Sequence, residues 1–201
     1  MESKFESLIG LHCAPTIMGI KPANLFSWQN SYDRATPCLD EIISTYKNKF
    51  DTLGISLEIL CKCKRHTLVY LYRDTLLQEH LHLKKSQEIL IKYNYKESAT
   101  IRELINSLKE HLRGQKNFPH EIGLFLGYPP EDVIGFIENN GKKCKLCGEW
   151  KVYGETNRAK NLFDRYKDCR NYLCEKISGG TCLSEIINEI NTSSNNIGLL
   201  T

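Results

Sequence analysis

The clearest pattern of polar and apolar positions predicts a pair of strands at residues 55–73. The tract ISLEILCKCKRHTLVYLYR begins with apolar residues at every second position, as in a half-buried strand. Residues 67–72 form a second run of β-forming side chains. The polar stretch between them, residues 62–65, predicts a hairpin. The residues expected to share the buried face of the first strand are Ile55, Leu57, Ile59 and Cys61.

Most of the remaining chain shows helical periodicity. One helix is expected to start at Thr36 as N-cap, with Pro37 in its first turn and Asp40 and Glu41 at the positive end of its dipole. Further helices are expected where apolar residues recur every three or four positions. These lie at about 74–83, 84–93, 100–112, 119–126, 130–140, 155–176 and 182–190.

Two segments lack a sustained helical period. Residues 8–28 hold two prolines and two glycines and predict short turns, with one helical turn at 23–28, lying on the body of the domain. Residues 143–153 predict a last strand or tight hairpin divided at Gly148. The fold class is therefore α+β, with a small three- or four-stranded sheet packed by several helices. Residues 1–178 are expected to form one domain, and 179–201 a C-terminal helix and disordered tail.

Composition places the chain among ordinary globular proteins. Its 201 residues are 41% apolar and 25% charged, enough for a core of its own. No apolar run is long enough to span a bilayer, and the first ten residues lack a secretory signal. Nine cysteines without such a signal indicate free thiols in a reducing compartment. We therefore expect a cytoplasmic protein without a membrane partner.

Charge does not favour nucleic acid. The net charge is +3, and residues 142–176 hold ten Lys and Arg against five Asp and Glu. Asp164, Asp168 and Glu175 are interleaved with the basic side chains and cancel much of their field. We read this segment as a solvated helix face and expect no nucleic-acid partner.

The cysteines offer an incomplete metal site. Cys144 and Cys147 have the CxxC spacing of half a zinc knuckle, but structural zinc needs four ligands. Cys169 and Cys174 would point to different sides of a helix, and the Cys61–Cys63 pair is far away in sequence. No metal site is expected. Nine thiols and six histidines leave a thiol-redox or metal-handling module as an alternative.

Two dipeptides supply candidate catalytic groups. His12 and Cys13 are adjacent in the irregular N-terminal segment, where a thiolate could act as nucleophile or ligand. His120 and Glu121 follow a proline at a helix start, although Glu121 there also complements the helix dipole and no HExxH motif is present. The candidate ligand-binding residues, of which Lys21 would hold an anionic group, are Lys21, Arg73, Tyr128 and Lys151.

Three tracts carry a resemblance to a known family. They are HCAPTIMGIKPANLF at 12–26, FPHEIGLFLGYPPEDVIGFI at 118–137 and WKVYG at 150–154. With the strand pair between them, the chain resembles the DUF3793 family, bacterial proteins of unknown function, over about residues 8–175. The resemblance implies no activity, and the tail after about 176 lies outside it.

The two longer tracts are the irregular ones, and sites lie preferentially on loops held by a scaffold. We therefore expect residues 11–26 and 118–130 to meet and form one small-molecule or enzymatic pocket. A non-catalytic interaction protein, with the basic C-terminal helices as its contact face, is the other alternative. The sequence assigns no reaction, substrate, cofactor or oligomeric state.

Overall fold

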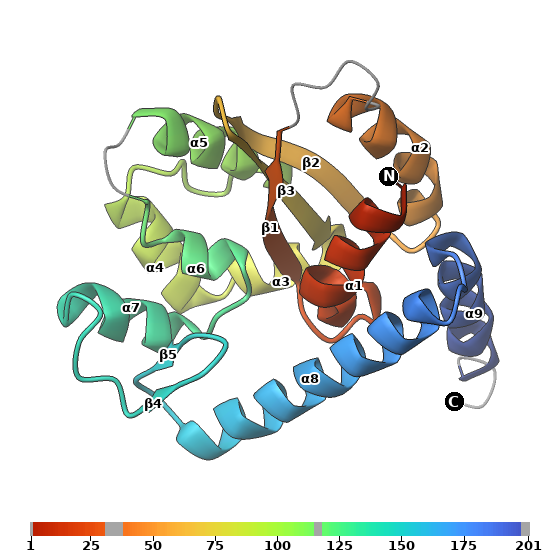
Figure 1. The fold of residues 1–201 in the computed structure, drawn as a ribbon. Coiled ribbons are helices and arrows are strands. Elements are labelled where there is room, and N and C mark those ends of the chain that lie inside the picture. Colours follow the sequence, from red (N-terminus) through yellow and green to blue (C-terminus); the bar gives the residue numbers. More distant parts are fainter. Residues whose placement is uncertain (1, 31–37, 115–117, 198–201) are drawn as a thin grey trace.

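A three-stranded antiparallel sheet forms the centre of the protein. The computed structural model describes residues 2–30, 38–114 and 118–197. Strands β1 (Ala23–Gln29), β2 (Ile55–Lys62) and β3 (His66–Arg73) lie in the order β1-β3-β2 (Figure 1). The predicted hairpin at 55–73 and the α+β class are confirmed.

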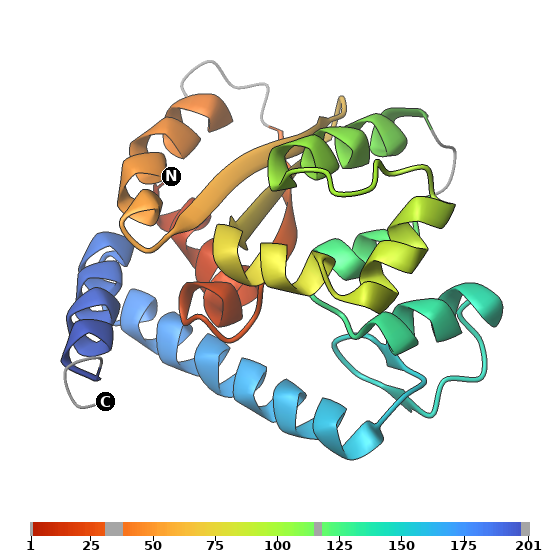
Figure 2. The ribbon, with the colours of Figure 1, turned by 180° about the vertical axis from the view of Figure 1, so that it is seen from behind.

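Helices cover both faces of this sheet (Figure 2). Alternation along the central strand separates two cores, because Val69 and Leu71 pack on one face while Tyr70 and Tyr72 pack on the other. The first face is covered by α1 (Glu2–Ile17), α2 (Leu39–Asp51), α8 (Thr156–Ser178) and α9 (Leu183–Ile197). The second is covered by α3 (Asp74–Leu81), α4 (Lys84–Lys92), α5 (Ile101–Gly114), α6 (Ile122–Phe125) and α7 (Pro130–Glu138). No helix in these described ranges is both long and apolar enough to cross a membrane.

The prediction of irregular turns for residues 8–28 is wrong. Residues 8–17 belong to α1 and residues 23–28 to β1. Phe5, Ile9 and Cys13 recur at a helical spacing of four and are fully buried. Pro15 lies inside the last turn of α1, where it removes one backbone hydrogen bond instead of ending the helix.

Close packing of α1 on α8 fixes the first core. A Cβ added at Gly10 would lie 2.9 Å from Ile177 Cδ1, so glycine lets the two helices approach. Helix α8 runs along the molecule from the region of β4 and β5 to α9 (Figure 1). Leu183 and Ile186 of α9 join the same core as α1.

A β-bulge alters the predicted face of β2. The register with β3 shifts between Ile59 and Cys61. As a result Leu60 is buried, whereas Ile59 and Cys61 are only half-buried. The prediction of strict alternation through Cys61 is wrong because the bulge inserts one residue and exchanges the faces.

Two helix boundaries also differ from prediction. Helix α2 has Cys38, not Thr36, as its N-cap, and Thr36 and Pro37 lie outside the described residues. The Cys38 N–H donates to the Glu41 carboxylate at 3.2 Å, which satisfies one free donor at the helix start. Helix α9 continues to Ile197, beyond the expected end at 190.

A small hairpin is held on α7 by one buried carboxylate. Strands β4 (Leu146–Cys147) and β5 (Lys151–Val152) form the predicted hairpin as a separate two-stranded sheet. Asp132 accepts three hydrogen bonds, each 2.7 Å long, from Trp150 Nε1 and the backbone N–H groups of Tyr153 and Gly154. These bonds fix the hairpin against α7.

Candidate functional site

A cavity of about 280 Å³ and another of about 360 Å³ lie on either side of Tyr128. We call the larger one the lysine cavity. It lies where α1, β1, the α6–α7 connection, the β4–β5 hairpin and α8 meet. Its lining residues are Leu11, His12, Lys21, Asn24, Leu25, Leu126, Tyr128, Glu149 and Arg170.

The turn after α1 places Lys21 in this cavity. The backbone N–H groups of Ile20 and Lys21 both donate to the Pro15 carbonyl, at 2.9 and 3.1 Å. Gly19 makes the reversal possible with a φ of +72°. Arg73 holds the end of α1 by donating to the carbonyls of Thr16 and Ile17, at 2.6 and 2.5 Å.

The ammonium of Lys21 is buried without a directly paired carboxylate among the described residues. Lys21 is only 4% exposed, and its Nζ lies 5.3 Å from the centre of the Tyr128 ring and 5.6 Å from that of Tyr166. Among the described residues it forms no hydrogen bond or ion pair through this ammonium. Burial lowers the pKa of Lys21 to about 8, although Glu149 acts in the opposite direction.

The carboxylate in the lining of the lysine cavity, Glu149, is already engaged in an ion pair. Glu149 Oε1 and Oε2 accept hydrogen bonds from the Arg170 guanidinium at 2.6 and 3.2 Å. His12 stands with its ring parallel to that of Phe26, 6.3 Å between centres. Burial and then Arg170 lower the pKa of His12, so its imidazole is neutral at pH 7. The cavity therefore presents one buried cation, one neutral imidazole and one satisfied ion pair.

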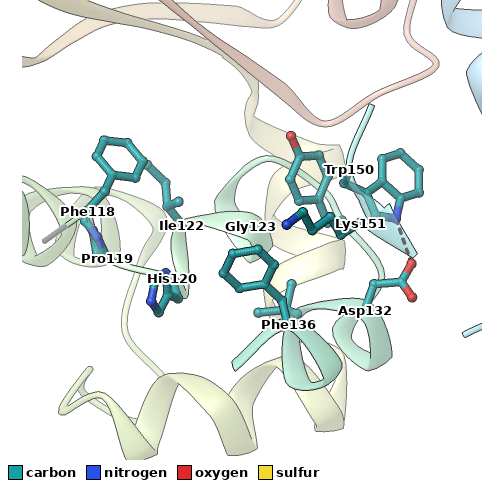
Figure 3. A pocket seen from close by; sticks show the side chains of 11 residues that line it. Phe118, Pro119, His120, Ile122, Gly123, Asp132, Phe136, Trp150 and Lys151 are labelled. Carbon is teal, nitrogen blue, oxygen red and sulfur yellow. Dashed lines mark hydrogen bonds between the residues drawn. The ribbon is translucent and has the colours of Figure 1, made fainter. Parts of the chain in front are cut away.

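The smaller cavity is walled by rings, and we call it the aromatic cavity (Figure 3). His120 packs edge-on against Phe136, with ring centres 5.2 Å apart. Lys151 Nζ donates to the Gly141 carbonyl at 2.6 Å. Lining residues are Phe118, Pro119, His120, Ile122, Gly123, Tyr128, Asp132, Val133, Phe136, Trp150 and Lys151.

The two tracts expected to form one pocket do touch. A Cβ at Gly127 would lie 2.6 Å from Pro22 Cδ, so the α6–α7 connection packs directly on the turn before β1. The candidate polar residues are nevertheless divided between two cavities. The lysine cavity contains His12, Lys21 and Tyr128, and the aromatic cavity contains His120, Tyr128 and Lys151.

Three other candidates lie outside both linings. Cys13 is fully buried in the first core, where burial raises the pKa of its thiol. Arg73 donates from Nε to the Thr16 carbonyl, from Nη2 to the Ile17 carbonyl and from Nη1 to the Leu53 carbonyl, the last at 2.8 Å. The contacts of Cys13 and Arg73 therefore stabilise the fold, and neither side chain faces one of the two cavities.

Glu121, the remaining candidate, is fully buried between helices. Its Oε1 lies 2.9 Å from His111 Nδ1 and accepts a hydrogen bond of 3.3 Å from the Tyr95 hydroxyl. Its Oε2 has no hydrogen-bond partner within the described part of the chain. This cluster ties the start of α6 to α5.

Sequence reasoning missed several lining residues. Glu149 and Arg170 lie in the segment 142–176 that we interpreted as a solvated helix face, and neither Phe136 nor Tyr166, which lies beside Lys21, was singled out. A signal was present in α8, because Phe163, Tyr166 and Arg170 recur at i, i+3 and i+7 on one helix face.

The described residues offer few potential metal ligands close to one another. They contain no group of three or more His, Cys, Asp or Glu side chains placed to hold a metal ion. Cys144 is half-buried and Cys147 exposed, both as free thiols. A second thiol pair lies at the end of β2, where the sulfurs of Cys61 and Cys63 are 3.5 Å apart.

A family model described as "Protein of unknown function (DUF3793)" matches residues 9–187. Since this match covers most of the chain, the protein belongs to the DUF3793 family. The match runs past residue 176 into α9, further than the resemblance seen in sequence. No curated protein and no solved structure matches the chain.

Proposed function

We propose that the protein binds a small anionic molecule in the lysine cavity, with the Lys21 ammonium as its principal anchor. The observation that carries this proposal is a buried cation that lines a cavity and has no carboxylate partner among the described residues. A buried charge is costly unless it is paired, and an anionic ligand supplies the missing charge.

The surroundings of Lys21 support an anion in preference to a neutral ligand. The faces of Tyr128 and Tyr166 offset only part of the cost of burial, since a cation–π contact contributes about 0.5–2 kcal/mol. Arg170 pairs with Glu149, so the negative charge of this carboxylate in the cavity wall is offset and does not exclude an anion. The Asn24 amide, whose oxygen accepts from Thr16, adds a donor at the cavity wall.

The free cysteines support the cytoplasmic location that we propose. All nine cysteines are free, including the exposed Cys38 and Cys182. Exposed free thiols persist in a reducing compartment, which supports a cytoplasmic protein.

Anion binding is tested by titrating the full chain with inorganic phosphate and, separately, with acetate in a calorimeter at pH 7. At least one anion is expected to bind with a Kd of about 1 mM or tighter. Binding should weaken above pH 8, as the Lys21 amine loses its proton. Lys21→Met should weaken it at least about tenfold.

Lys160→Met is the matched control, because Lys160 is exposed on α8 and lies outside the cavity. It should leave the Kd unchanged. Absence of saturable binding for both anions, or equal loss in the two lysine variants, would refute the proposal.

A second candidate function, thiol–disulfide exchange, is favoured by the contact between the sulfurs of Cys61 and Cys63 at 3.5 Å. Cys63 is exposed, whereas burial and then the neighbouring Cys63 raise the pKa of Cys61. Cys63 is therefore the attacking thiol. Its thiolate attacks a small disulfide and releases one thiol, and Cys61 then displaces the second thiol to leave a Cys61–Cys63 disulfide.

Peptide mass mapping after exposure to oxidised glutathione tests this exchange. The wild-type peptide spanning 61–63 should lose two hydrogen atoms. Cys61→Ser should instead accumulate glutathione on Cys63, because the resolving thiol is gone. Cys147→Ser serves as the control and should still form the 61–63 disulfide. An unmodified 61–63 peptide in the wild type would exclude this second function.

A further inference from the structure

From the composition of its walls, we infer that the aromatic cavity is a separate binding site for a planar aromatic molecule with one negative charge. The inference does not rest on the lysine cavity, which lies on the other side of Tyr128. Three observations support it: aromatic rings enclose the space, packing and hydrogen bonds fix these rings in place, and a lysine ammonium lies at the rim.

Four aromatic side chains surround the space. Phe118 precedes α6, Phe136 projects from α7, Tyr128 lies between these helices, and Trp150 comes from the hairpin. Aliphatic walls come from Ile122 and Val133. Ligand pockets begin at about 300 Å³, so the 280 Å³ here suits a molecule of one or two rings. Aromatic rings pair with other rings in offset-stacked or edge-on arrangements, which contribute about 0.5–1.5 kcal/mol beyond the area buried.

The walls are fixed in place before any ligand arrives. Tyr128 stacks on Trp150 at 5.1 Å between ring centres, and Trp150 is bonded to Asp132 at 2.7 Å. Phe163 packs edge-on behind Trp150 at 4.6 Å. Because these contacts fix the positions of Tyr128 and Trp150, the cavity is preformed. A ligand can therefore bind without much reordering of its walls.

Gly141 lets the floor of the cavity close around Phe136. Its φ of +69° favours glycine, and an added Cβ would lie 3.1 Å from the Phe136 ring and 3.6 Å from Lys151 Nζ. The absence of a side chain at Gly141 therefore leaves room for both the Phe136 ring and the Lys151 ammonium.

The rim favours a negative charge. Lys151 donates one hydrogen bond to Gly141, and its ammonium points toward the space between Phe136 and Ile122 (Figure 3). An ammonium has three donors, so two remain for a ligand. The carboxylate in the lining, Asp132, has both oxygens engaged by Trp150 Nε1 and backbone N–H groups. A cationic ligand would meet Lys151 without a free carboxylate to offset it.

Three ligands of similar shape separate ring recognition from charge recognition. Benzoate, benzyl alcohol and benzylamine share one ring and differ in charge. The readout is the indole N–H resonance of Trp150 in a ¹H–¹⁵N NMR spectrum. The protein has two tryptophans, and Trp28 lies in the first core as an internal reference. Trp28→Phe assigns the two signals.

Benzoate should shift the Trp150 signal saturably and bind most tightly, followed by benzyl alcohol and then benzylamine. Lys151→Met should reduce benzoate affinity to that of benzyl alcohol, and Lys151→Arg should preserve the preference. Phe136→Ala should weaken both ligands about tenfold or more. Phe136→Leu keeps a large apolar side chain at this position and should also weaken both ligands, which separates the loss of the ring contact from a folding defect.

Lys21→Met separates this site from the lysine cavity, because Lys21 meets the aromatic cavity only through the shared Tyr128 ring and its loss should weaken benzoate binding less than Lys151→Met does. A larger loss of benzoate affinity in Lys21→Met than in Lys151→Met would place the ligand in the lysine cavity and overturn the inference. A Trp150 signal that no ligand moves, or benzylamine binding as tightly as benzoate, would overturn it as well.

Discussion

Replacing Lys21 by methionine should stabilise the folded protein at neutral pH. Methionine keeps a long apolar side chain in the same space but removes the buried charge. A residue that stabilises the fold would give the opposite result, so the direction of the change discriminates between a binding group and a structural one.

The magnitude follows from the pKa of Lys21. Its pKa falls from an ordinary value of about 10.4 to about 8 in the folded state, and each pKa unit corresponds to about 1.4 kcal/mol. The charged form is thus disfavoured by about 3 kcal/mol on folding. Loss of the contacts with Tyr128 and Tyr166 offsets about 1–2 kcal/mol of the gain. The net stabilisation expected for Lys21→Met at pH 7 is about 1–2 kcal/mol.

The pH dependence has a defined direction. Below pH 8 the lysine is charged in both states, and the penalty is fully present. Between about pH 8 and 10.4 the unfolded chain binds more protons than the folded one, so wild-type stability rises with pH. Above this window both states are neutral and the penalty is gone. The advantage of Lys21→Met should therefore disappear as pH rises from 8 to about 10.4.

Urea unfolding of wild type and Lys21→Met at pH 7 and at about pH 10 measures both the stabilisation and its pH dependence. Groups other than Lys21 titrate in both proteins, so their contribution cancels in the difference. Lys160→Met should change stability by less than about 0.5 kcal/mol at either pH. A Lys21→Met variant less stable than wild type at pH 7, or a stability difference that is constant with pH, would refute this reasoning.

Four further outcomes follow from the structure. Asp132→Ala should cost about 3 kcal/mol of unfolding free energy and perturb Trp150 fluorescence, because one buried and two partly buried donors lose their acceptor; a loss below about 1 kcal/mol would contradict the role given to this carboxylate. Gly127→Ala should cost about 2 kcal/mol, since φ is +73° and the added Cβ would lie 2.6 Å from Pro22; an unchanged urea midpoint would be inconsistent with that packing. Excess chelator should leave Tm unchanged, and a drop would indicate structural zinc. Fluorescence anisotropy with single- and double-stranded oligonucleotides should show no saturable, salt-dependent binding by residues 142–176, and tight binding would favour an interaction protein.

The sequence predicted the elements that depend on local periodicity. The hairpin at 55–73 and the helices α3–α8 follow from alternating or helical apolar spacing. Helix α1 was missed because Pro15 and Gly10 suggested breaks. The helix nevertheless continues past Pro15 to Ile17 with one backbone hydrogen bond missing, and Gly10 serves the contact with Ile177, which lies far away in sequence.

The candidate sites likewise divide into residues that a local sequence pattern indicates and residues that only the tertiary packing brings together. His12, Lys21 and His120 were found because polar residues in apolar, irregular tracts indicate a pocket wall. Glu149 and Arg170 could not be found in this way, since they reach the cavity only through the packing of the hairpin and α8 on α1. The split into two cavities depends on where the Tyr128 ring lies, which no local pattern encodes.

The ionisation of Lys21 is the most direct test of the account. NMR of the full chain with ¹³C-labelled lysine, titrated from about pH 6 to 11, resolves its side-chain signal, and Lys21→Met assigns it. We predict a pKa near 8 that rises when inorganic phosphate or acetate is added, because a bound anion favours the charged amine. A Lys21 pKa close to the ordinary value of about 10.4, unmoved by either anion, would contradict the central claim.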